Sequence, residues 1–364
     1  MEAKYPLKPE ERVLYALRGL YRQYGYSPFK MGKFEEYDLY VRNKDFLVSD
    51  GIITFTDTDG RLMALKPDVT LSIIKNARVT AGCVQKLYYN ENVYRVSGST
   101  RCFKEIMQTG LECIGDVGLY NLCEVISLAA RSLELIDENY VLDISHMGVV
   151  SALVDALGLD ADARQGVLSC IAEKNADGVR KLCPDGAIDG ILALIASHGP
   201  AAQVIPALMP YCDSGAAKAA LDELQRVTDA LAAEGLDKIS LDFSIVNDMN
   251  YYNGIVFMGY IDGIPASVLS GGQYDKLMQR MGKSARAVGF AIYMDLLERL
   301  GDSERPYDVD TLLLYDDGAD VAALARAVRQ LTAQGKRVTA QKAVPEKLRY
   351  REIVRFDSRQ GVLN

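Results

Sequence analysis

The sequence predicts an α+β protein: an antiparallel sheet with helices, interrupted by an all-helical insertion and followed by a small, truncated α/β unit. Before residue 148, short apolar runs broken by turn residues indicate strands that pair with their neighbours. The stretch that follows is rich in Ala, Leu and Asp and shows helix patterns only, and the tail holds one strand–helix–strand pattern. The 364 residues allow two or three domains. We therefore expect a core at 1–147 and 236–303, a helical insertion at 148–235 and a C-terminal unit at 304–364.

The elements follow from periodicity and turn chemistry. Apolar residues recur at helical spacing between Pro9 and Gly25, and again over 119–136, so both segments are expected to be helices. An Asp-Thr-Asp-Gly turn at 57–60 separates two apolar runs and predicts a hairpin. The pair Gly271-Gly272 is expected to break the chain. The other expected elements are a helix at 68–76, strands at 84–89, 106–114, 140–145, 239–245 and 255–261, a strand then a helix at 287–300, and a strand, helix and strand at 311–315, 319–334 and 337–340.

Composition narrows the possible functions. The formal net charge of −8 repels the phosphate backbone of nucleic acids, so no tRNA is expected as a partner. No run of about 18 apolar residues is present, so no membrane segment is expected. The two histidines, His146 and His198, follow a predicted strand and a predicted helix, and neither lies beside a nucleophile motif. The seven cysteines form no C-x-x-C pair, so we expect free thiols in a reducing cytoplasm, with neither a metal nor a cofactor.

Two segments place polar side chains where a ligand could lie. Leu65-Lys66-Pro67-Asp68-Val69-Thr70 delivers a carboxylate and a hydroxyl from a strand to a helix start, where Asp68 and Thr70 could equally cap the helix. In Gln108-Thr109-Gly110-Leu111-Glu112, alternation puts Gln108, Gly110 and Glu112 on one strand face. The glycine would let a small ligand approach, and an inward Glu112 needs a partner. The alternative is a strand side that faces solvent.

Two later segments have the same character. Asn247-Asp248-Met249-Asn250-Tyr251-Tyr252-Asn253-Gly254 precedes an apolar strand, and its paired tyrosines can supply an aromatic wall and a phenol donor. The same tyrosines could instead pack in a hairpin turn. Ser270-Gly271-Gly272-Gln273-Tyr274-Asp275 puts two glycines before a helix, where the backbone could approach a ligand.

In this order the four segments resemble the class II synthetase core of histidyl-tRNA synthetases. In that family the segments read L-R-P-E-G-T, Q-x-G-x-E, R-G-L-D-Y-Y and G-G-R-Y-D. The resemblance extends over residues from about 8 to 300, because the helical stretch matches the family's insertion and 287–291 matches the entry to motif 3. It implies the antiparallel sheet of class II aminoacyl-tRNA synthetases as the fold of the core.

The resemblance also implies a histidine pocket, residue by residue. Asp68 and Thr70 match residues that hold the ammonium group of the amino acid, and Gln108 matches another residue at that end. Glu112 and Tyr252 match the pair that contacts the imidazole nitrogens. That pair suits an imidazole, because each ring nitrogen needs a donor or acceptor and a carboxylate favours the protonated ring. Tyr251 and Tyr274 are candidates for the walls.

The catalytic arginines of the synthetases do not carry over. The arginine of R-G-L-D-Y-Y is Asn247 here, and the motif 3 arginine falls on Leu296. The motif 2 arginine aligns on Tyr94, although Arg95 could replace it if the loop is one residue shorter. Losing two or three arginines, at roughly 1.5–3 kcal/mol each, would slow adenylation by roughly 10² to 10⁶. The tail of about sixty residues is also too short for the family's anticodon-binding domain. No catalytic residue is therefore expected.

This combination is similar to one branch of the fold, the regulatory subunits of ATP phosphoribosyltransferase, the first enzyme of histidine biosynthesis. The resemblance implies a cytoplasmic, non-catalytic protein that pairs with itself and joins a short-form catalytic subunit in a hetero-octamer. It also implies allosteric feedback by L-histidine, bound either in the pocket above or at the subunit interface. Two other functions remain open: an active histidyl-tRNA synthetase with a shortened C-terminus, which Asn247 and Leu296 argue against, and a stand-alone histidine-binding protein.

Overall fold

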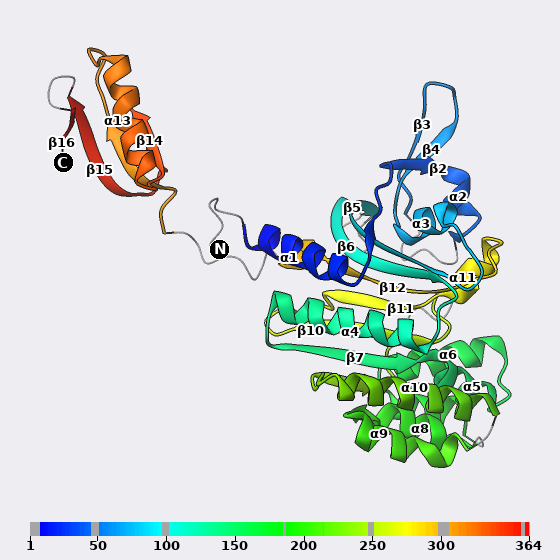
Figure 1. Cartoon of the computed structure of the whole chain (residues 1–364). Helices are drawn as coiled ribbons and strands as arrows, with labels where there is room; N and C mark the ends of the chain where they lie inside the picture. The colour runs from blue at the N-terminus through cyan, green and yellow to red at the C-terminus, as the bar shows by residue number, and fades with distance from the viewer. Residues whose placement is uncertain are drawn as a thin grey trace. The chain divides into compact units, whose positions relative to one another are not determined.

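The computed structural model describes residues 8–44, 51–96, 102–184, 187–213, 215–246, 251–297, 306–357 and 361–363. The chain divides into two compact units, residues 1–301 and 302–364, and each is described by itself (Figure 1). None of the described helices is long and apolar enough to cross a lipid bilayer.

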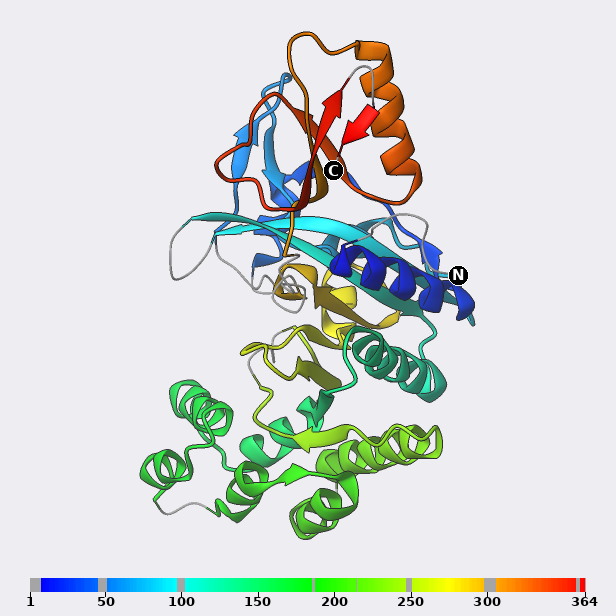
Figure 2. The same cartoon turned by 90° about the vertical axis from the view of Figure 1, so that its left-hand side faces the viewer.

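A nine-stranded sheet is the frame of the larger unit (Figure 2). Its order is β1-β5-β6-β12-β11-β10-β7-β9-β8, and every neighbouring pair from β5 to β7 in that order is antiparallel, which confirms the predicted sheet. The strands are β1 (Ser27–Pro28), β5 (Val84–Val96), β6 (Phe103–Gly115), β7 (Tyr140–His146), β8 (His198–Gly199), β9 (Ile239–Asp242), β10 (Ile255–Ile261), β11 (Leu269–Gln273) and β12 (Arg286–Tyr293).

The β5–β6 hairpin separates two hydrophobic cores. Both strands are longer than predicted, and they stay paired from Val84↔Gly115 to Val96↔Phe103. The extension carries polar residues on one side, which is why the apolar pattern did not predict it. Along β6, Leu111 and Cys113 face one core, whereas Ile114 faces the other. Glu112 alternates onto the same side as Ile114. Because successive side chains of a strand point to opposite faces, the position of a residue along β6 decides which core its side chain enters.

Helices cover both faces of the sheet. The first core contains residues of α1 (Pro9–Gln23) and α4 (Leu119–Ile136), both as predicted from periodicity. The second core contains residues of α3 (Thr70–Asn76) and α11 (Asp275–Arg280). The predicted hairpin at 57–60 is present and joins a separate three-stranded sheet of order β2-β4-β3. The remaining elements here are β2 (Phe34–Glu36), α2 (Tyr37–Val41), β3 (Thr54–Thr56), β4 (Leu62–Leu65) and α12 (Met294–Leu297).

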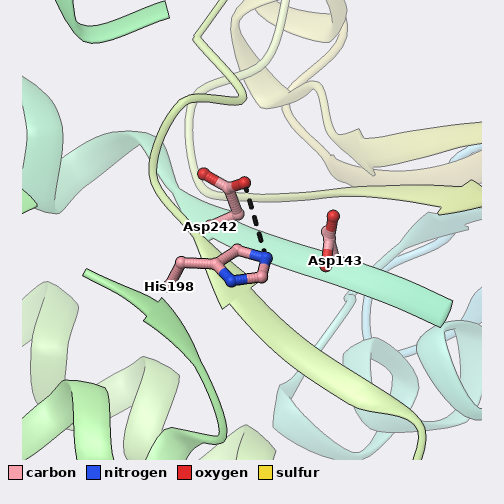
Figure 3. Close-up of side chains that lie close together, drawn as sticks. All are labelled: Asp143, His198 and Asp242. Atoms are coloured by element: carbon pink, nitrogen blue, oxygen red, sulfur yellow. Dashed lines mark ion pairs between the residues drawn. The ribbon is translucent and has the colours of Figure 1, made fainter. Parts of the chain in front are cut away.

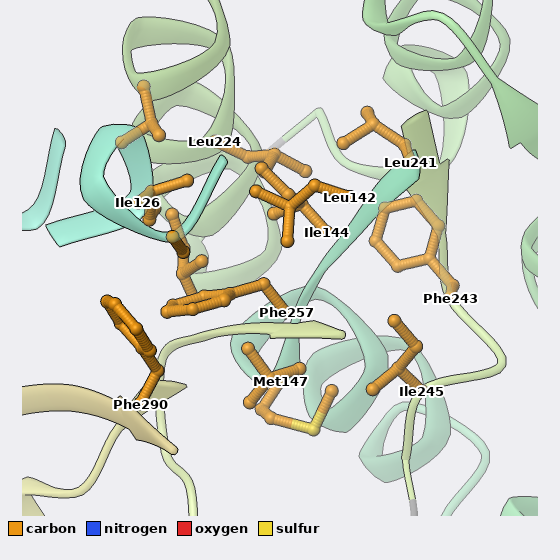
Figure 4. Packing of buried hydrophobic residues seen from close by; sticks show 14 of the residues in the cluster. Ile126, Leu142, Ile144, Met147, Leu224, Leu241, Phe243, Ile245, Phe257 and Phe290 are labelled. Carbon is orange, nitrogen blue, oxygen red and sulfur yellow. The ribbon is translucent and has the colours of Figure 1, made fainter. Parts of the chain in front are cut away.

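Among the described residues of the predicted helical insertion, the regular elements are helices and one short strand. Its helices are α5 (Met147–Asp155), α6 (Ala161–Ala172), α7 (Ala176–Leu182), α8 (Asp189–Ala196), α9 (Ala201–Leu208), a 3₁₀ turn (Met209–Tyr211) and α10 (Gly215–Ala233). The exception is β8, which pairs with β9 and extends the sheet, so the all-helical prediction is wrong at His198. The insertion shares the first core, where Leu224 of α10 belongs to the same cluster as Ile126, Leu142 and Phe257 (Figure 4).

Gly271 and Gly272 lie inside β11 and do not break the chain, which corrects the prediction. Neighbouring strands crowd both residues. A Cβ on Gly271 would lie 2.5 Å from Cβ of Phe290, and one on Gly272 would lie 2.7 Å from Cδ1 of Tyr252. The glycines are therefore required for close packing of the sheet and its aromatic side chains, rather than for a turn.

The smaller unit is an α/β layer. Its sheet has the order β14-β13-β15-β16, with β13 parallel to both β14 and β15. One helix, α13 (Val321–Ala333), connects β13 (Val309–Leu314) to β14 (Val338–Gln341), as the β-α-β pattern predicts. The remaining strands are β15 (Tyr350–Asp357) and β16 (Gly361–Leu363).

A buried ion pair fixes the segment that leads into α3. The Nζ of Lys66 lies 2.5 Å from Oε2 of Glu91 on β5, and the lysine side chain is only 1% exposed. The backbone N–H of Tyr94 donates to the carbonyl of Lys66 at 2.9 Å, and Nε of Arg95 donates to the carbonyl of Pro67 at 2.9 Å. These contacts set the position at which Asp68 enters the second core.

We expect Lys66→Met to lower the free energy of unfolding by about 3–5 kcal/mol, because it leaves the Glu91 carboxylate largely buried without its cation. Urea unfolding at neutral pH measures the difference. The double variant Lys66→Met/Glu91→Gln should regain much of the loss, since no unpaired charge remains. A single variant as stable as the original protein would contradict this role of the ion pair.

Candidate functional site

A cavity of about 150 Å³ lies on the second-core side of the sheet, between β5, β6, β12 and the start of α3. The structure brings all seven predicted pocket residues together at its wall, from four separate segments of the chain. These are Asp68, Thr70, Gln108, Glu112, Tyr251, Tyr252 and Tyr274. The volume is below the 300–1,000 Å³ typical of sites for drug-sized molecules, so the cavity suits a ligand the size of an amino acid.

Glu112 lies at the floor of the cavity and is 2% exposed. Its Oε1 accepts a hydrogen bond from the hydroxyl of Thr70 at 2.9 Å, and its Oε2 accepts one from the phenol of Tyr274 at 2.6 Å. Burial raises the pKa of Glu112 to about 8, although both hydrogen bonds act in the opposite direction. The solvent-facing interpretation of this strand is therefore wrong, and the carboxylate has the partners that its burial requires.

Asp68 combines the two roles that the sequence left open. Its Oδ1 accepts a hydrogen bond from the backbone N–H of Leu71 at 2.8 Å, in the first turn of α3, and the residue also lines the cavity. Burial raises the pKa of Asp68, while the hydrogen bond from Leu71 and the nearby charge of Arg95 lower it. The hydroxyl of Thr70 donates to Glu112, so Thr70 supports the other carboxyl group of the cavity wall.

Three tyrosines form one side of the cavity. The rings of Tyr251 and Tyr252 are 4.7 Å apart between centroids in an edge-to-face arrangement, and those of Tyr251 and Tyr274 are 5.9 Å apart. Gln273 orients the loop that carries two of them, because its Oε1 accepts the backbone N–H of Ile255 at 2.7 Å. The Asn247–Asn250 part of the third segment lies outside the described residues.

Two glycines, on β6 and β12, make room for side chains of the cavity wall, which corrects the ligand role predicted for Gly110. A Cβ on Gly110 would lie 2.1 Å from the carbonyl oxygen of Phe290 and 2.7 Å from the phenol oxygen of Tyr89. A Cβ on Gly289 would lie 1.8 Å from Oε2 of Glu112. Gly110 therefore makes room for the protein's own tyrosine and not for a ligand, whereas Gly289 makes room for the Glu112 carboxylate.

Comparisons with known proteins agree with this fold. A family profile described as histidyl-tRNA synthetase matches residues 6–297. An ATP phosphoribosyltransferase regulatory subunit from Moorella thermoacetica is 30% identical over 345 residues, which cover 90% of this chain and 86% of the relative. The chain belongs to the histidyl-tRNA synthetase family, and in it to the ATP phosphoribosyltransferase regulatory subunits.

Two solved structures show the same fold as this member of the regulatory-subunit family. An ATP phosphoribosyltransferase regulatory subunit/histidyl-tRNA synthetase from Bacillus halodurans C superposes with a TM-score of 0.78 at 22% identity, covering 98% of both chains. A chain of the ATP phosphoribosyl transferase (HisG:HisZ) complex from Thermotoga maritima gives 0.62 at 19% identity, covering 78% of this chain and 96% of that one.

The cavity of this regulatory-subunit family member also contains residues that the sequence analysis did not assign to it. Tyr89 faces the cavity because it pairs with Gly110 across the hairpin, a position that strand alternation could have indicated. Arg95 lines the same cavity, whereas Tyr94 points away and donates to Glu105 at 2.9 Å. Ser270 and Tyr293 come from β11 and β12, and only the sheet order brings them to the wall.

Leu296 and His146, which were also singled out from the sequence, have structural roles. Leu296, at the position of the motif 3 arginine, lies in α12 and packs against the first core. The Nδ1 of His146 accepts the backbone N–H of Gly148 at 3.0 Å, so the residue caps α5, and its Nε2 lies 3.1 Å from Oε2 of Glu223. Both observations place these side chains outside the cavity.

The pKa of Glu112 predicts how stability depends on pH. Glu112 keeps its proton up to about pH 8 in the folded protein, whereas it releases the proton near pH 4.5 in the unfolded chain. The stability that the protonated group contributes is therefore fully present below pH 4.5 and is lost as the pH rises through 8. At about 1.4 kcal/mol per pKa unit, the loss is up to about 5 kcal/mol. We expect Glu112→Gln to remove this part of the slope in thermal melts between pH 5 and 9.

Glu105→Gln is a matched control on the same strand. Hydrogen bonds from Tyr94 and Asn92 lower the pKa of the exposed Glu105, so its titration lies below this pH range. The control should keep the slope of the original protein. Equal slopes for Glu112→Gln and Glu105→Gln would show that Glu112 does not titrate in this range.

Proposed function

We propose that this chain is the regulatory subunit that a short-form ATP phosphoribosyltransferase catalytic subunit requires for activity, and that it transmits feedback inhibition by L-histidine. The cavity is the observation that carries the proposal. It combines an amino-acid-sized volume with two buried carboxylates, one guanidinium and aromatic walls in a member of the regulatory-subunit family. We place the complex in the cytoplasm, with the chain as a homodimer within a hetero-octamer.

The chemistry of the wall supports histidine as the ligand. A zwitterionic amino acid with an imidazole needs groups that accept from its ammonium and ring nitrogens and a cation for its carboxylate. Asp68 and Gln108 are our candidates for the ammonium group, and Glu112 with Tyr252 for the imidazole. Arg95, whose guanidinium lines the same cavity, is our candidate for the carboxylate. Thr70, Tyr251 and Tyr274 complete the predicted contacts.

The proposal separates ligand binding from catalysis. The arginines that synthetases use for ATP and the adenylate are replaced at Asn247 and Leu296 in the alignment of motifs. A cavity that binds the amino acid without those groups has no means to stabilise the charge of the transferring phosphate. The ATP phosphoribosyl transferase (HisG:HisZ) complex from Thermotoga maritima supports a separate catalytic partner.

Reconstitution tests the function directly. We expect a purified short-form catalytic subunit to form phosphoribosyl-ATP faster when this chain is added, and L-histidine to suppress the gain. Feedback of this kind needs a coupling free energy of only about 1–3 kcal/mol between the two sites. Unchanged turnover on addition of the chain would refute the regulatory role. Activation without histidine sensitivity would refute the feedback part alone.

An active histidyl-tRNA synthetase is the second candidate, and Arg95 favours it. This residue lies at the cavity, where it could serve as the motif 2 arginine, and the matching family profile carries the synthetase name. Histidine-dependent exchange of pyrophosphate into ATP distinguishes the two functions. Pyrophosphate exchange at a rate comparable to that of a synthetase would refute the regulatory proposal and support the synthetase function.

A pair of isosteric variants tests whether histidine binds in this cavity or at a subunit interface. A bound imidazolium would favour the ionised form of Glu112 in spite of its raised pKa. Glu112→Gln removes this charge-assisted contact, which is worth about 1.5–3 kcal/mol, so we expect histidine binding to weaken about 10- to 150-fold in titration calorimetry. Glu105→Gln makes the same change outside the cavity and should bind histidine as the original protein does. Equal histidine affinities for the two variants would show that histidine binds at another surface and not in this cavity.

A further inference from the structure

Three side chains outside the cavity converge at the far edge of the nine-stranded sheet. Asp143, His198 and Asp242 lie on the adjacent strands β7, β8 and β9 (Figure 3). One ligand atom from each lies within 4.8 Å of the others. Strand pairing creates the arrangement, because His198 is the register partner of Asp242, and Asp143 is the partner of Ser240 two residues earlier on the same face.

Asp143 has an unsatisfied carboxylate oxygen. The residue is 8% exposed, and its Oδ1 is buried with no hydrogen-bond partner among the residues that the structure describes. The hydroxyl of Ser240, its register partner, interacts with the Asp143 carboxylate, but the two groups do not reach the geometry of a hydrogen bond. Buried polar atoms without well-aligned partners are rare because each costs free energy, so a cation at this point would stabilise Asp143.

The surrounding charges leave room for a further cation. Lys174 lies 2.7 Å from Oδ2 of Asp242, and the backbone N–H of Ser244 donates to Oδ1 of the same carboxylate at 2.9 Å. These contacts satisfy Asp242 but not Asp143. With two aspartates and one lysine, the cluster has more acidic than basic side chains beside His198. His198 is 3.9 Å from Asp242, and its side chain is 55% exposed, so its ring is accessible from solvent.

We propose that Asp143, His198 and Asp242 form a binding site for a divalent transition-metal ion, with Zn²⁺ the best match. One imidazole nitrogen and two carboxylate oxygens suit zinc, whereas Mg²⁺ and Ca²⁺ prefer oxygen ligands alone. Ligand atoms around a tetrahedral zinc lie about 3.4 Å apart, given bond lengths of about 2.0–2.1 Å. The exposed ring of His198 can move inward to reach that spacing, and a water would complete the four ligands.

The metal would fasten the 148–235 stretch to the sheet. His198 comes from that stretch, whereas Asp143 and Asp242 come from the strands before and after it. The spacing of the cysteines predicted no metal site, but these three residues lie far apart in the chain and form no local ligand pattern. Only the pairing of β7, β9 and β8 brings them together.

The test uses the full chain, without a histidine tag, in its reduced form. Titration calorimetry with ZnCl₂ should give one bound zinc per chain, and zinc should raise the melting temperature. His198→Ala should weaken binding at least tenfold and abolish the thermal shift. This side chain is more than half exposed, so the variant should fold. Asp143→Asn should have the same effect on affinity.

Matched controls distinguish this site from other ligands. His146→Gln changes the other histidine, and Asp229→Asn changes an exposed aspartate of α10, so both should bind zinc as the original protein does. Lys174→Met removes the cation that competes for Asp242, and we expect it to tighten binding. Cobalt(II) serves as a spectroscopic probe, because thiolate ligands give an intense near-ultraviolet charge-transfer band that a nitrogen–oxygen site lacks.

Several outcomes would overturn the proposal. Absence of zinc binding is one, and binding that is unchanged in both His198→Ala and Asp143→Asn is another. A thiolate band with cobalt that disappears when the exposed Cys83 and Cys102 are replaced would assign the metal to cysteine. Weaker binding in Lys174→Met would indicate that the cluster is a structural ion network, in which the lysine is the only cation.

Discussion

The burial of one carboxylate, that of Glu112, constrains the whole ligand side of the molecule. A carboxyl group in the middle of a nine-stranded sheet is stable only when it is protonated or when donors surround it. Thr70 from α3 and Tyr274 from the start of α11 supply two donors. Gly289 on the neighbouring strand supplies the space, since any side chain there would overlap the carboxylate. Three separate elements are thus positioned around a single side chain.

The Lys66–Glu91 pair extends this constraint to the entrance of α3. It holds a lysine and a glutamate out of solvent beside the strand that carries Tyr89 and Arg95. A buried pair of this kind is weak evidence for net stability, but it fixes one geometry because either partner alone is costly. The position of Asp68, two residues after Lys66, depends on that geometry.

The helical stretch at 148–235 is connected to the cavity through the end of β7. His146 contacts Glu223 of α10 on one side, and on the other it pairs with Ile255 in β10. The backbone N–H of Met147 donates to the carbonyl of Gly254 at 2.8 Å, in the loop that follows Tyr252. A chain of direct contacts therefore runs from the helices to an aromatic wall of the cavity. The same stretch reaches the sheet a second time through β8, at the edge that holds Asp143 and Asp242.

The sequence by itself determined the local elements and the identities of the pocket residues. Periodicity located α1, α4 and β10 almost to the residue, because each buries one regular face. Four ordered motifs indicated seven residues that the fold brings to one cavity wall, although their role toward histidine remains a prediction.

Tertiary structure decided what depends on neighbours across the sheet. It placed Gly271 and Gly272 in a packed strand, turned Gly110 toward Tyr89, oriented Arg95 rather than Tyr94 to the cavity, and joined Asp143, His198 and Asp242. Strand order and register act between residues that are distant in sequence, and for that reason no local pattern encodes them.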